Sequence, residues 1–467
     1  MAGSPLASLV LGIDSSTQST KAVLVDAADG TVVDERRAPH PPGTSVDPRA
    51  WLRALDEAAG PLLERADAVA VGGQQHGMVA LDEDGEPVHD ALLWNDVRSA
   101  AAAAELVEEI GGPDRCAELT GSVFNASYTI TKLRWLRDHE PVAVARIHDV
   151  MLPHDYATWH LTGRSAEPTT DRGDASGTGY WSPADDGWLP DLLKQSLGRE
   201  ARLPRIAAAR EVVGESAGTP VAPGTGDNMA AALGLGLRPG DVAVSIGTSG
   251  VASMVTSEPI ADGTGAISGF ADATGQFLPL ACTINAARIL DLGAHLLGVD
   301  HEGLAELALE SVPGAHGLTL LPYLDGERTP QRPDAAGSLH GLTTATTRAD
   351  LARAHVEGLL FSLADAVDAL AEVSGSRPQR LLLIGGAARN PAVLALAPLV
   401  FDAPVVLPDP AEYVALGAAR QAAWALAGSE HPPEWPVRTS DLPTSQTLAG
   451  LRDDYALLRE RTSTWTH

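Results

Sequence analysis

Short apolar runs at the start of the chain are separated by polar turns. Residues 8–14 and 21–26 are apolar, and the polar segment 15–20 lies between them. The dipeptide Asp29-Gly30 then precedes a third run at 31–37, and such a dipeptide is typical of a hairpin turn. The pattern predicts consecutive strands of one sheet, joined by tight turns.

Helical patterns dominate the segments that follow. Residues 48–66 have helical periodicity, residues 99–110 are alanine-rich, and residues 127–139 and 153–162 are also predicted to be helical. Residues 68–73 form a short apolar run that ends in two glycines, which indicates a buried strand. This first part of the chain is therefore predicted to be mixed α/β.

The same pattern restarts near residue 240. Residues 241–255 predict a strand, a small polar turn and a second strand, and residues 380–400 predict a strand, a glycine turn and a helix. Both halves therefore begin with a hairpin rich in Gly, Ser and Thr, and both later contain an apolar strand that ends in Gly-Gly. We interpret this as an internal duplication, which predicts two similar α/β halves with a cleft between them.

The length of 467 residues exceeds what one compact core normally supports. We expect an N-terminal domain over 1–237, a C-terminal domain over 238–430, and a segment rich in Pro, Ser and Thr with a terminal helix over 431–467. The start of the second domain, 238–245, is the expected hinge.

The charge of the chain disfavours several classes of partner. It has 61 acidic and 33 basic residues, a formal net charge of −28. Nucleic acid and anionic membranes attract basic patches, so neither is an expected partner. Two cysteines make no disulfide framework, and no apolar run reaches the roughly 18 residues of a membrane helix. The apolar start also lacks the basic residues of a signal peptide, and we expect a cytoplasmic protein.

Two polar turns suit phosphate groups. The first runs from Asp14 to Lys21, where backbone N–H groups and hydroxyls follow a strand end, and Asp14 is a candidate Mg²⁺ ligand through water. The second, Gly247-Thr248-Ser249-Gly250, occupies the equivalent place in the second half. Together they would hold a triphosphate from both sides, although each alone is also compatible with an ordinary polar hairpin. The chain has neither a P-loop motif nor a strand-coupled GxGxxG motif.

Asp227 follows a glycine turn, Gly224-Thr225-Gly226, and precedes an alanine-rich helix. A carboxylate at a helix start is often a plain helix cap. The alternative is chemical, because phosphoryl transfer needs one positioned carboxylate that accepts the proton of the attacking hydroxyl. The segment alone leaves both interpretations open.

Two further motifs of the first half, residues 74–77 (QQHG) and 94–98 (WNDVR), combine amide, imidazole, carboxylate, guanidinium and aromatic groups. These are the groups that bind a polyol by directional hydrogen bonds. His76 alone would more often be a structural histidine. In the second half, the glycines of 385–390 (GGAARN) would let a flat base approach the backbone, or they form an ordinary turn between strand and helix.

Taken together, these motifs resemble those of the FGGY carbohydrate kinase family, over roughly residues 8–430. The first family signature is matched by residues 127–139 (SYTITKLRWLRDH) without departure. The second falls on 337–342 (GSLHGL) and 350–357 (DLARAHVE), where His355 replaces a small or aliphatic residue.

This resemblance implies an α/β fold with two ribonuclease-H-like domains, of the actin, Hsp70 and hexokinase type, and a central cleft. It also implies ATP-dependent phosphorylation of a sugar, assisted by Mg²⁺. Residues 321–330 (LPYLDGERTP) and the motifs at 74–77 and 94–98 resemble the family members that act on D-xylulose, although Gln75 stands where those members have methionine. We therefore expect D-xylulose to be converted to D-xylulose 5-phosphate.

The resemblance further implies a role for each matched residue. Asp227 resembles the catalytic base, and Asp14 resembles the magnesium-associated carboxylate. The implied sugar contacts are Gln75, His76, Trp94, Asn95, Asp96 and Asn228. The implied nucleotide contacts are Thr17, Gln18 and Lys21 in the first phosphate loop, Gly247 and Thr248 in the second, and Gly385, Gly386 and Asn390 at the adenosine site. Ala387 stands where the family usually has a third glycine.

Three alternatives stay open on the sequence. One is a kinase for another polyol, such as ribulose. A second is a catalytically silent sugar-binding regulator, which the presence of Asp14, Asp227 and both polar turns disfavours. A third is an ATP-driven chaperone or filament protein of the wider fold group, which the motifs at 74–77 and 94–98 disfavour. The resemblance also suggests a homodimer.

Overall fold

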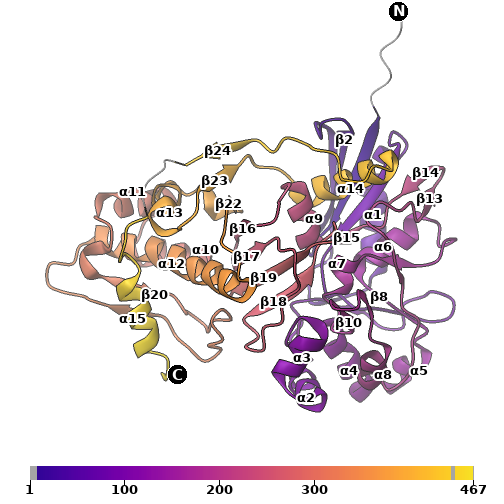
Figure 1. Cartoon of the computed structure of the whole chain (residues 1–467), viewed down its shortest axis with the longest axis horizontal. Helices are drawn as coiled ribbons and strands as arrows, with labels where there is room; N and C mark the ends of the chain where they lie inside the picture. Colours follow the sequence, from indigo (N-terminus) through magenta and orange to yellow (C-terminus); the bar gives the residue numbers. More distant parts are fainter. Residues whose placement is uncertain (1–7, 443–446, 466–467) are drawn as a thin grey trace, which may run out of the picture.

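Two α/β halves lie side by side in the computed structural model, which describes residues 8–442 and 447–465. Figure 1 shows the first half in indigo to magenta and most of the second half in orange to yellow. Each half is built around one seven-stranded sheet. The predicted arrangement of two α/β halves is therefore confirmed.

The first sheet has the strand order β13-β14-β5-β1-β2-β3, and β15 also pairs with β5. Its strands are β1 (Leu9–Ser15), β2 (Ser19–Asp26), β3 (Val32–Pro39), β5 (Ala68–Gly73), β13 (Gly214–Ser216), β14 (Thr219–Val221) and β15 (Thr225–Gly226). Short two-stranded pieces flank it: β4 (Ser45–Val46) with β7 (Ala91–Leu92), β6 (Val79–Leu81) with β8 (Asp149–Met151), β9 (Thr169–Thr170) with β12 (Arg205–Ile206), and β10 (Trp181–Ser182) with β11 (Gly187–Trp188).

The second sheet has the order β18-β19-β17-β16-β22-β23-β24. Its strands are β16 (Asp241–Ile246), β17 (Gly250–Met254), β18 (Ile267–Ala271), β19 (Phe277–Thr283), β22 (Arg380–Ile384), β23 (Val405–Pro408) and β24 (Thr439–Asp441). A separate hairpin joins β20 (Thr319–Leu321) to β21 (Ser338–His340).

The two sheets repeat one pairing pattern. Strand β1 is antiparallel to β2 and parallel to β5, and β16 is likewise antiparallel to β17 and parallel to β22. Strand β5, which ends in Gly72-Gly73, and strand β22, which is followed by Gly385-Gly386, therefore occupy the same position in each half. This confirms the internal duplication that the sequence predicts.

Helices cover both sheets. Those of the first half are α1 (Arg49–Leu63), α2 (Ala100–Ile110), α3 (Pro113–Thr120), α4 (Thr129–His139), α5 (Pro141–Arg146), α6 (Pro153–Leu161), α7 (Arg172–Ala175), α8 (Pro190–Leu197) and α9 (Asp227–Gly234). Those that follow are α10 (Ala287–Leu297), α11 (His301–Glu310), α12 (Arg348–Ser374), α13 (Pro391–Val400), α14 (Tyr413–Ala427) and α15 (Asp453–Arg461). No helix in the described ranges is both long enough and apolar enough to cross a bilayer.

Helix α12 is the central helix of the second half, and its ends are defined by the sequence. Thr347 caps the start by accepting the N–H of Asp350, and the Asp350 carboxylate accepts the N–H of Thr347 in return. Gly375 ends the helix in the left-handed conformation, which a glycine adopts without steric cost. Between these ends the helix contributes a continuous run of buried residues to the largest apolar core.

Helix α14 returns to the first half and packs on its sheet and on α9. Its alanines Ala415, Ala418 and Ala422 join the apolar cluster of β1, β2 and β5. The approach is so close that a Cβ atom at Gly12 would lie 1.9 Å from the carbonyl oxygen of Ala415, and one at Gly417 would lie 1.8 Å from that of Ala230. Only glycine fits at both contacts.

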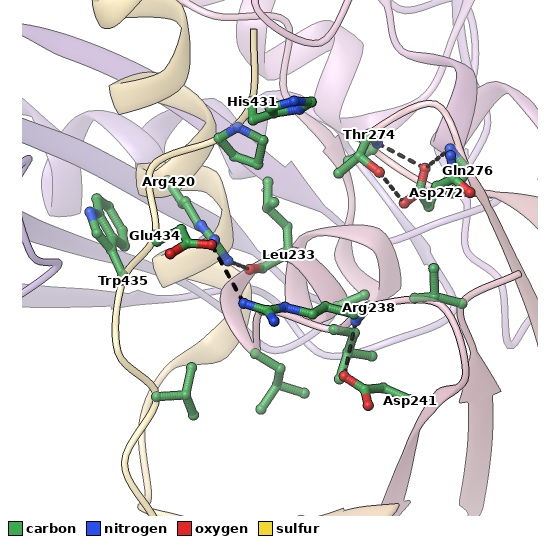
Figure 2. Close-up of a pocket in the computed structure, with 18 of the residues that line it drawn as sticks. Leu233, Arg238, Asp241, Asp272, Thr274, Gln276, Arg420, His431, Glu434 and Trp435 are labelled. Atoms are coloured by element: carbon green, nitrogen blue, oxygen red, sulfur yellow. Dashed lines mark hydrogen bonds and ion pairs between the residues drawn. The ribbon is translucent and has the colours of Figure 1, made fainter. Parts of the chain in front are cut away.

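The segment 428–441 crosses from the first half back to the second, where β24 joins the edge of the second sheet beside β23. Trp435 Nε1 donates to the carbonyl of Ala27 in the first half at 3.1 Å. A cavity of about 1100 Å³ lies under this segment, and Figure 2 shows residues that line it. Arg420, in its wall, donates to the carbonyls of Leu233 and Pro433. The crossing segment therefore connects both halves beside their junction.

Candidate active site

Neighbouring strand ends bring Asp14 and Asp227 to the same edge of the first sheet. Strand β5 is parallel to β1 and to β15, with Gly72 beside Asp14 and Gly73 beside Gly226. Asp227 follows Gly226 directly and opens α9. Two carboxylates that are far apart in the sequence therefore emerge from the two strands that flank β5.

Two cavities meet at this edge, and both are lined by Asp227 and Asn228. The larger cleft cavity, of about 680 Å³, lies between the halves, and its walls include Asp14, Ser16, Lys21, Ser245, Gly385, Gly386, Arg389, Glu412 and Tyr413. The smaller cleft cavity, of about 450 Å³, has walls that include Thr17, Gln75, His76, Trp94, Asn125, Tyr128, Ser249, Ser268, Cys282 and Arg328. The side chain of Asp227 therefore lies where the two cleft cavities meet.

The carboxylate of Asp227 is partly buried at the junction of the two cavities. Burial raises its pKa to about 7, and the nearby carboxylates of Asp14 and Asp174 act in the same direction. The backbone N–H of Asn228 donates to Asp227 Oδ1 at 2.8 Å and favours the charged form. A carboxyl with a pKa near neutrality is suited to general-base catalysis.

Asp14 ends strand β1 and is buried in the floor of the larger cleft cavity. Burial raises its pKa, opposed by the hydroxyl of Ser16 and by the charge of Lys21. Lys21 Nζ lies 3.7 Å from Asp14 Oδ2 and 2.5 Å from Glu412 Oε2. The carboxylates and the hydroxyl make this wall rich in the oxygen donors that a hard divalent cation prefers.

Amide groups continue from Asp227 into the smaller cleft cavity. Asn228 Nδ2 donates to Gln75 Oε1 at 2.7 Å and lies 3.2 Å from Asp227 Oδ1. With Nδ2 engaged, Asn228 Oδ1 remains as an acceptor. The two predicted sugar contacts and the predicted base thus form one hydrogen-bonded group.

His76 presents a neutral imidazole to the smaller cleft cavity. Burial lowers its pKa to about 3, helped by the charges of Lys132 and Arg328. Its Nδ1 lies 2.6 Å from the carbonyl of Gly177, so Nδ1 carries the proton and Nε2 is an acceptor. The backbone of His76 has φ +65°, a conformation that non-glycine residues rarely adopt and that is concentrated at functional sites.

Trp94 lies beside the first polar turn. Its indole Nε1 donates to Thr17 Oγ1 at 3.0 Å, and 41% of its surface is exposed. Both residues line the smaller cleft cavity, so the structure places Thr17 beside the predicted sugar contacts. An exposed indole at the rim of a polar cavity offers an apolar wall for a sugar.

Several predicted residues lie outside both cavities, and their roles stay predictions. Asp96 is buried and accepts from Thr44 and Arg98, and Asn95 beside it is exposed. Gln18 is exposed, and Thr248 is exposed in the turn between β16 and β17 together with the half-buried Gly247. Asn390 caps helix α13 by accepting from the N–H groups of Ala392 and Val393.

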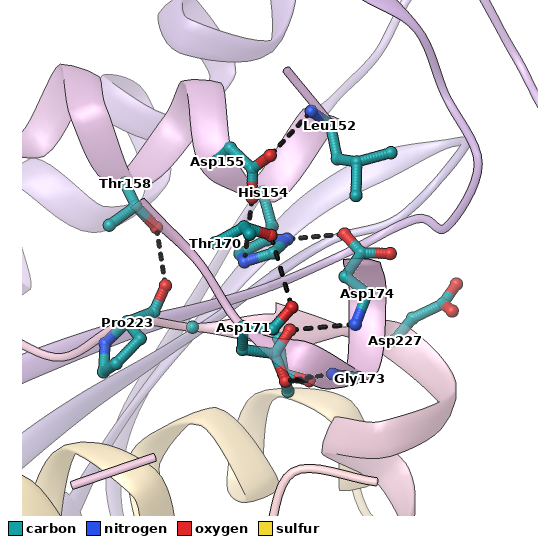
Figure 3. Close-up of polar contacts among 12 residues, drawn as sticks. Leu152, His154, Asp155, Thr158, Thr170, Asp171, Gly173, Asp174, Pro223 and Asp227 are labelled. Atoms are coloured by element: carbon teal, nitrogen blue, oxygen red, sulfur yellow. Dashed lines mark hydrogen bonds and ion pairs between the residues drawn. The ribbon is translucent and has the colours of Figure 1, made fainter. Parts of the chain in front are cut away.

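A buried ionic cluster lies under the loop that carries Asp227, and sequence reasoning missed it. Figure 3 shows His154 between the carboxylates of Asp174 and Asp155, at 2.5 Å and 3.2 Å. Burial alone would lower the pKa of His154, but the carboxylates of Asp155 and Asp174 outweigh it and raise this pKa to about 9. The two carboxylates therefore favour the protonated form of the imidazole.

Asp171 links the cluster to the loop that carries Asp227. Its Oδ2 accepts from Thr225 Oγ1 at 2.7 Å, two residues before Asp227, and its Oδ1 accepts from the N–H of Asp174 at 2.9 Å. Gln75 Nε2 and Asp174 Oδ1 are both buried and have no hydrogen-bond partner among the described residues. The cluster thus supports the loop of Asp227 through the hydrogen bond of Asp171 to Thr225.

The site predictions also missed several residues that line the two cavities, and three of these belong to segments that the sequence had singled out. Tyr128 belongs to the first family signature, and Arg328 belongs to the segment 321–330. Arg389 belongs to the glycine turn after β22. Ser268 and Cys282, on β18 and β19, had no sequence signal.

Comparison with known proteins identifies the class. Residues 9–234 match the N-terminal domain, and residues 242–426 the C-terminal domain, of the FGGY family of carbohydrate kinases. The chain belongs to this family, and it is an ATP-dependent sugar kinase with an actin- and hexokinase-like fold.

Individual relatives cover nearly the whole chain. It is 49% identical over 438 residues to a xylulose kinase of Streptomyces coelicolor, covering 90% of this chain and 89% of that protein. It is 47% identical over 480 residues to a xylulose kinase of Streptomyces rubiginosus, covering 97% and 98%. The crystal structure of a xylulose kinase from Bifidobacterium adolescentis superposes with a TM-score of 0.93 at 43% identity, covering 97% of this chain and 100% of that chain.

Proposed function

We propose that this chain transfers the γ-phosphoryl group of ATP to the O5 hydroxyl of D-xylulose, with Asp227 as the base. One observation carries the proposal: Asp227 and Asn228 line both cleft cavities. A sugar in the smaller cavity and a triphosphate in the larger one would meet at this carboxylate. The similarity to xylulose kinases at 47–49% identity supports the choice of sugar.

The chain's own groups supply positioning and proton transfer. Asp227 accepts the proton of the attacking hydroxyl, a contribution of roughly 10²–10⁴-fold in rate. Asn228 Oδ1 and His76 Nε2 accept hydrogen bonds from sugar hydroxyls, and Trp94 covers the sugar at the rim. Closure of the halves would exclude water from the phosphoryl group.

We also propose a Mg²⁺ ion at Asp14, held largely through water. Its donor set fits, because Asp14, Ser16 and Asp227 all present oxygen atoms to the larger cleft cavity. When bound, the ion neutralises charge on the transferring phosphoryl group. Lys21, now paired with Asp14 and Glu412, would then be free to contact phosphate oxygens.

The remaining assignments are proposals that rest on the family resemblance. The nucleotide would contact Thr17, Gln18, Lys21, Gly247, Thr248, Gly385, Gly386 and Asn390, with Gly385 and Gly386 supported by their place in the larger cavity. We retain the division into 1–237, 238–430 and 431–467, a cytoplasmic location and a homodimer as proposals. Sedimentation velocity tests the last of these.

A coupled assay of ADP release tests the function. It would compare D-xylulose, D-ribulose, L-ribulose, L-xylulose, glycerol and gluconate at saturating Mg-ATP. We expect D-xylulose to give the highest kcat/KM. A higher kcat/KM with another polyol would overturn the assignment of the sugar, and the absence of any sugar-dependent ADP release from folded protein would overturn the kinase.

A further inference from the structure

The segment 321–330, singled out in the sequence, reaches the smaller cleft cavity through one side chain, Arg328. Its neighbour Glu327 is buried with 1% of its surface exposed. Glu327 Oε1 accepts the N–H groups of Ile284 and Arg328 at 2.5 Å and 2.8 Å, and Oε2 accepts Asn285 Nδ2 at 3.0 Å. A buried carboxylate therefore fixes the backbone of Arg328 to the end of β19.

The other side of this loop is fixed as well. Thr329 Oγ1 donates to the carbonyls of Cys282 and Ala266 at 2.8 Å and 3.1 Å, and Asn285 Nδ2 also donates to the carbonyl of Gly326 at 2.8 Å. Arg328 is thus held between two anchored neighbours. Such support is typical of a side chain whose position matters at a site.

The guanidinium of Arg328 has no carboxylate partner within ion-pair distance among the described residues, whereas the nearby Arg288 is paired with Asp325 of the same segment. Arg328 instead lines the smaller cleft cavity together with Cys282, His76 and Tyr128, and its charge helps to lower the pKa of His76. A guanidinium has five donors in a planar arrangement, so this one retains donors for a ligand.

Arg328 and Asp227 are the two side chains with a formal charge among the residues that line this cavity, and they come from different halves of the chain. Asp227 and Asn228 also line the larger cleft cavity, but Arg328 and Cys282 do not. The cavity therefore has an anionic end at the site of phosphoryl transfer and a cationic end away from it.

The chemistry of a 2-ketopentose matches these two ends. Its furanose rings close through O5 onto C2, so a molecule with a free O5 hydroxyl is the open-chain ketone. With O5 at Asp227, the other end of the molecule presents the O1 hydroxyl and the O2 carbonyl on adjacent carbons. A planar guanidinium binds two adjacent oxygens with two parallel hydrogen bonds.

We propose that Arg328 is a specificity-determining residue that donates hydrogen bonds to O1 and O2 of the open-chain ketose. The inference rests on the proposed function, because the orientation of the sugar follows from phosphorylation at O5. In this arrangement Asp227, from the first half, selects the reacting O5 end of the sugar. Arg328, from the second half, selects the ketone end.

The test combines a variant with an altered substrate. Arg328→Met and wild type would each be assayed with D-xylulose and with 1-deoxy-D-xylulose, which lacks the O1 hydroxyl. Hydrogen bonds to a charged group correspond to roughly 10- to 150-fold in affinity. We expect Arg328→Met to lower kcat/KM for D-xylulose by about that factor, mainly through KM for the sugar, with KM for ATP within about twofold.

The decisive quantity is the coupling between the two changes. Wild type should prefer D-xylulose over the 1-deoxy sugar by about tenfold or more, and Arg328→Met should show little preference. Arg328→Lys, which keeps the charge but loses the planar pair of donors, should fall between them. Arg288→Met, outside the cavity, should behave as wild type, and thermal unfolding of each variant checks the fold.

Two results would overturn the inference, and they are distinguishable. An unchanged preference for D-xylulose in folded Arg328→Met and Arg328→Lys would mean that Arg328 does not contact O1, while the kinase assignment stands. Failure of wild type to release ADP with D-xylulose would remove the proposed function, and this inference with it.

Discussion

The imidazole Nδ1 of His154 lies 2.5 Å from Asp174 Oδ2, and neither side chain has any measurable exposure to solvent. Asp155 lies on the other side of the ring, and Asp171 joins the same cluster to Thr225. A buried charge needs partners in good geometry, because the medium around it solvates it poorly. The cluster therefore stabilises the structure beside the loop that carries Asp227.

Replacing His154 by glutamine should destabilise the fold strongly. The change leaves buried carboxylates without their cation, and breaking such a pair typically costs about 3–5 kcal/mol. Urea unfolding measures the difference. His160→Gln is the matched control, because His160 pairs with Asp56 at an exposed site and should cost less than about 1 kcal/mol. Equal losses in the two variants would contradict the role of the cluster.

The contribution of this cluster to stability should fall as the pH rises from about 4 to about 9, although the lowered pKa values of His76 and Lys132 act in the opposite direction on the chain as a whole. The raised pKa of His154, about 9 against the usual 6.5, gives stability that is fully present below pH 6.5 and lost on passing pH 9. Burial raises the pKa of Asp155 to about 7 and that of Asp171 to about 6, so the folded chain also holds protons there that the unfolded chain has released. All three terms have the same sign.

Unfolding free energies of wild type and His154→Gln at pH 6, 7.5 and 9 isolate this contribution, because the other titrating groups are common to both proteins. The difference between the two should become smaller as the pH rises. A difference that stays constant over this interval would count against the role of His154.

Asp227→Asn should retain sugar binding and lose about 10²–10⁴-fold in kcat, because the amide cannot accept the proton. Isothermal titration with D-xylulose and the ADP assay separate the two effects. Asp84→Asn, at an exposed turn of the same half, is the control and should match wild type. Turnover near the wild-type rate in Asp227→Asn would remove Asp227 from the role of base.

The acid limb of kcat/KM for the sugar should reflect the same residue. With a pKa of about 7, Asp227 is mostly protonated and inactive as a base at pH 6, and mostly ionised at pH 8. The rate should rise about tenfold per pH unit well below pH 7 and level off above it. A profile that is flat between pH 5.5 and 8 would show that this group does not control the reaction.

Gly417→Ala should destabilise the junction of the halves. The added Cβ would lie 1.8 Å from the carbonyl oxygen of Ala230 in α9, and a helix backbone cannot move away locally. We expect a loss of about 3 kcal/mol or more, with a lower kcat because α9 begins at Asp227. Leu426→Ala, at an exposed position of α14, should change stability by less than about 1 kcal/mol. A thermal midpoint for Gly417→Ala equal to that of Leu426→Ala would refute this packing.

The sequence predicts the parts of the fold that depend on local pattern. The apolar runs at 8–14 and 68–73 became β1 and β5, and the repeat near residue 240 became β16 and β17. The Gly-Gly pairs at the end of β5 and just after β22 correctly indicated these two strands. A backbone that approaches another segment closely needs residues without side chains.

The sequence does not predict those parts of the site in which residues from distant segments are brought together by the fold. His154, Asp171 and Asp174 lie on or beside α6 and α7, and nothing in their local sequence distinguishes them from surface residues. Asp96 illustrates the reverse: it stands in a motif with a predicted sugar role, yet its carboxylate is buried against Thr44 and Arg98. The hydrogen-bond and ion-pair partners of these polar side chains are set by the packing of elements that are distant in the sequence.

The three-residue strand β24 has a consequence for handling the protein. Its residues Thr439, Ser440 and Asp441 are polar and exposed, and they cover the edge of β23, whose residues Val405 and Val406 are buried. A cut between residues 428 and 438 would detach this cover and leave an apolar strand with unpaired backbone groups, which is a template for association between chains. Proteolytic nicking of this crossing segment is therefore expected to appear first as aggregation.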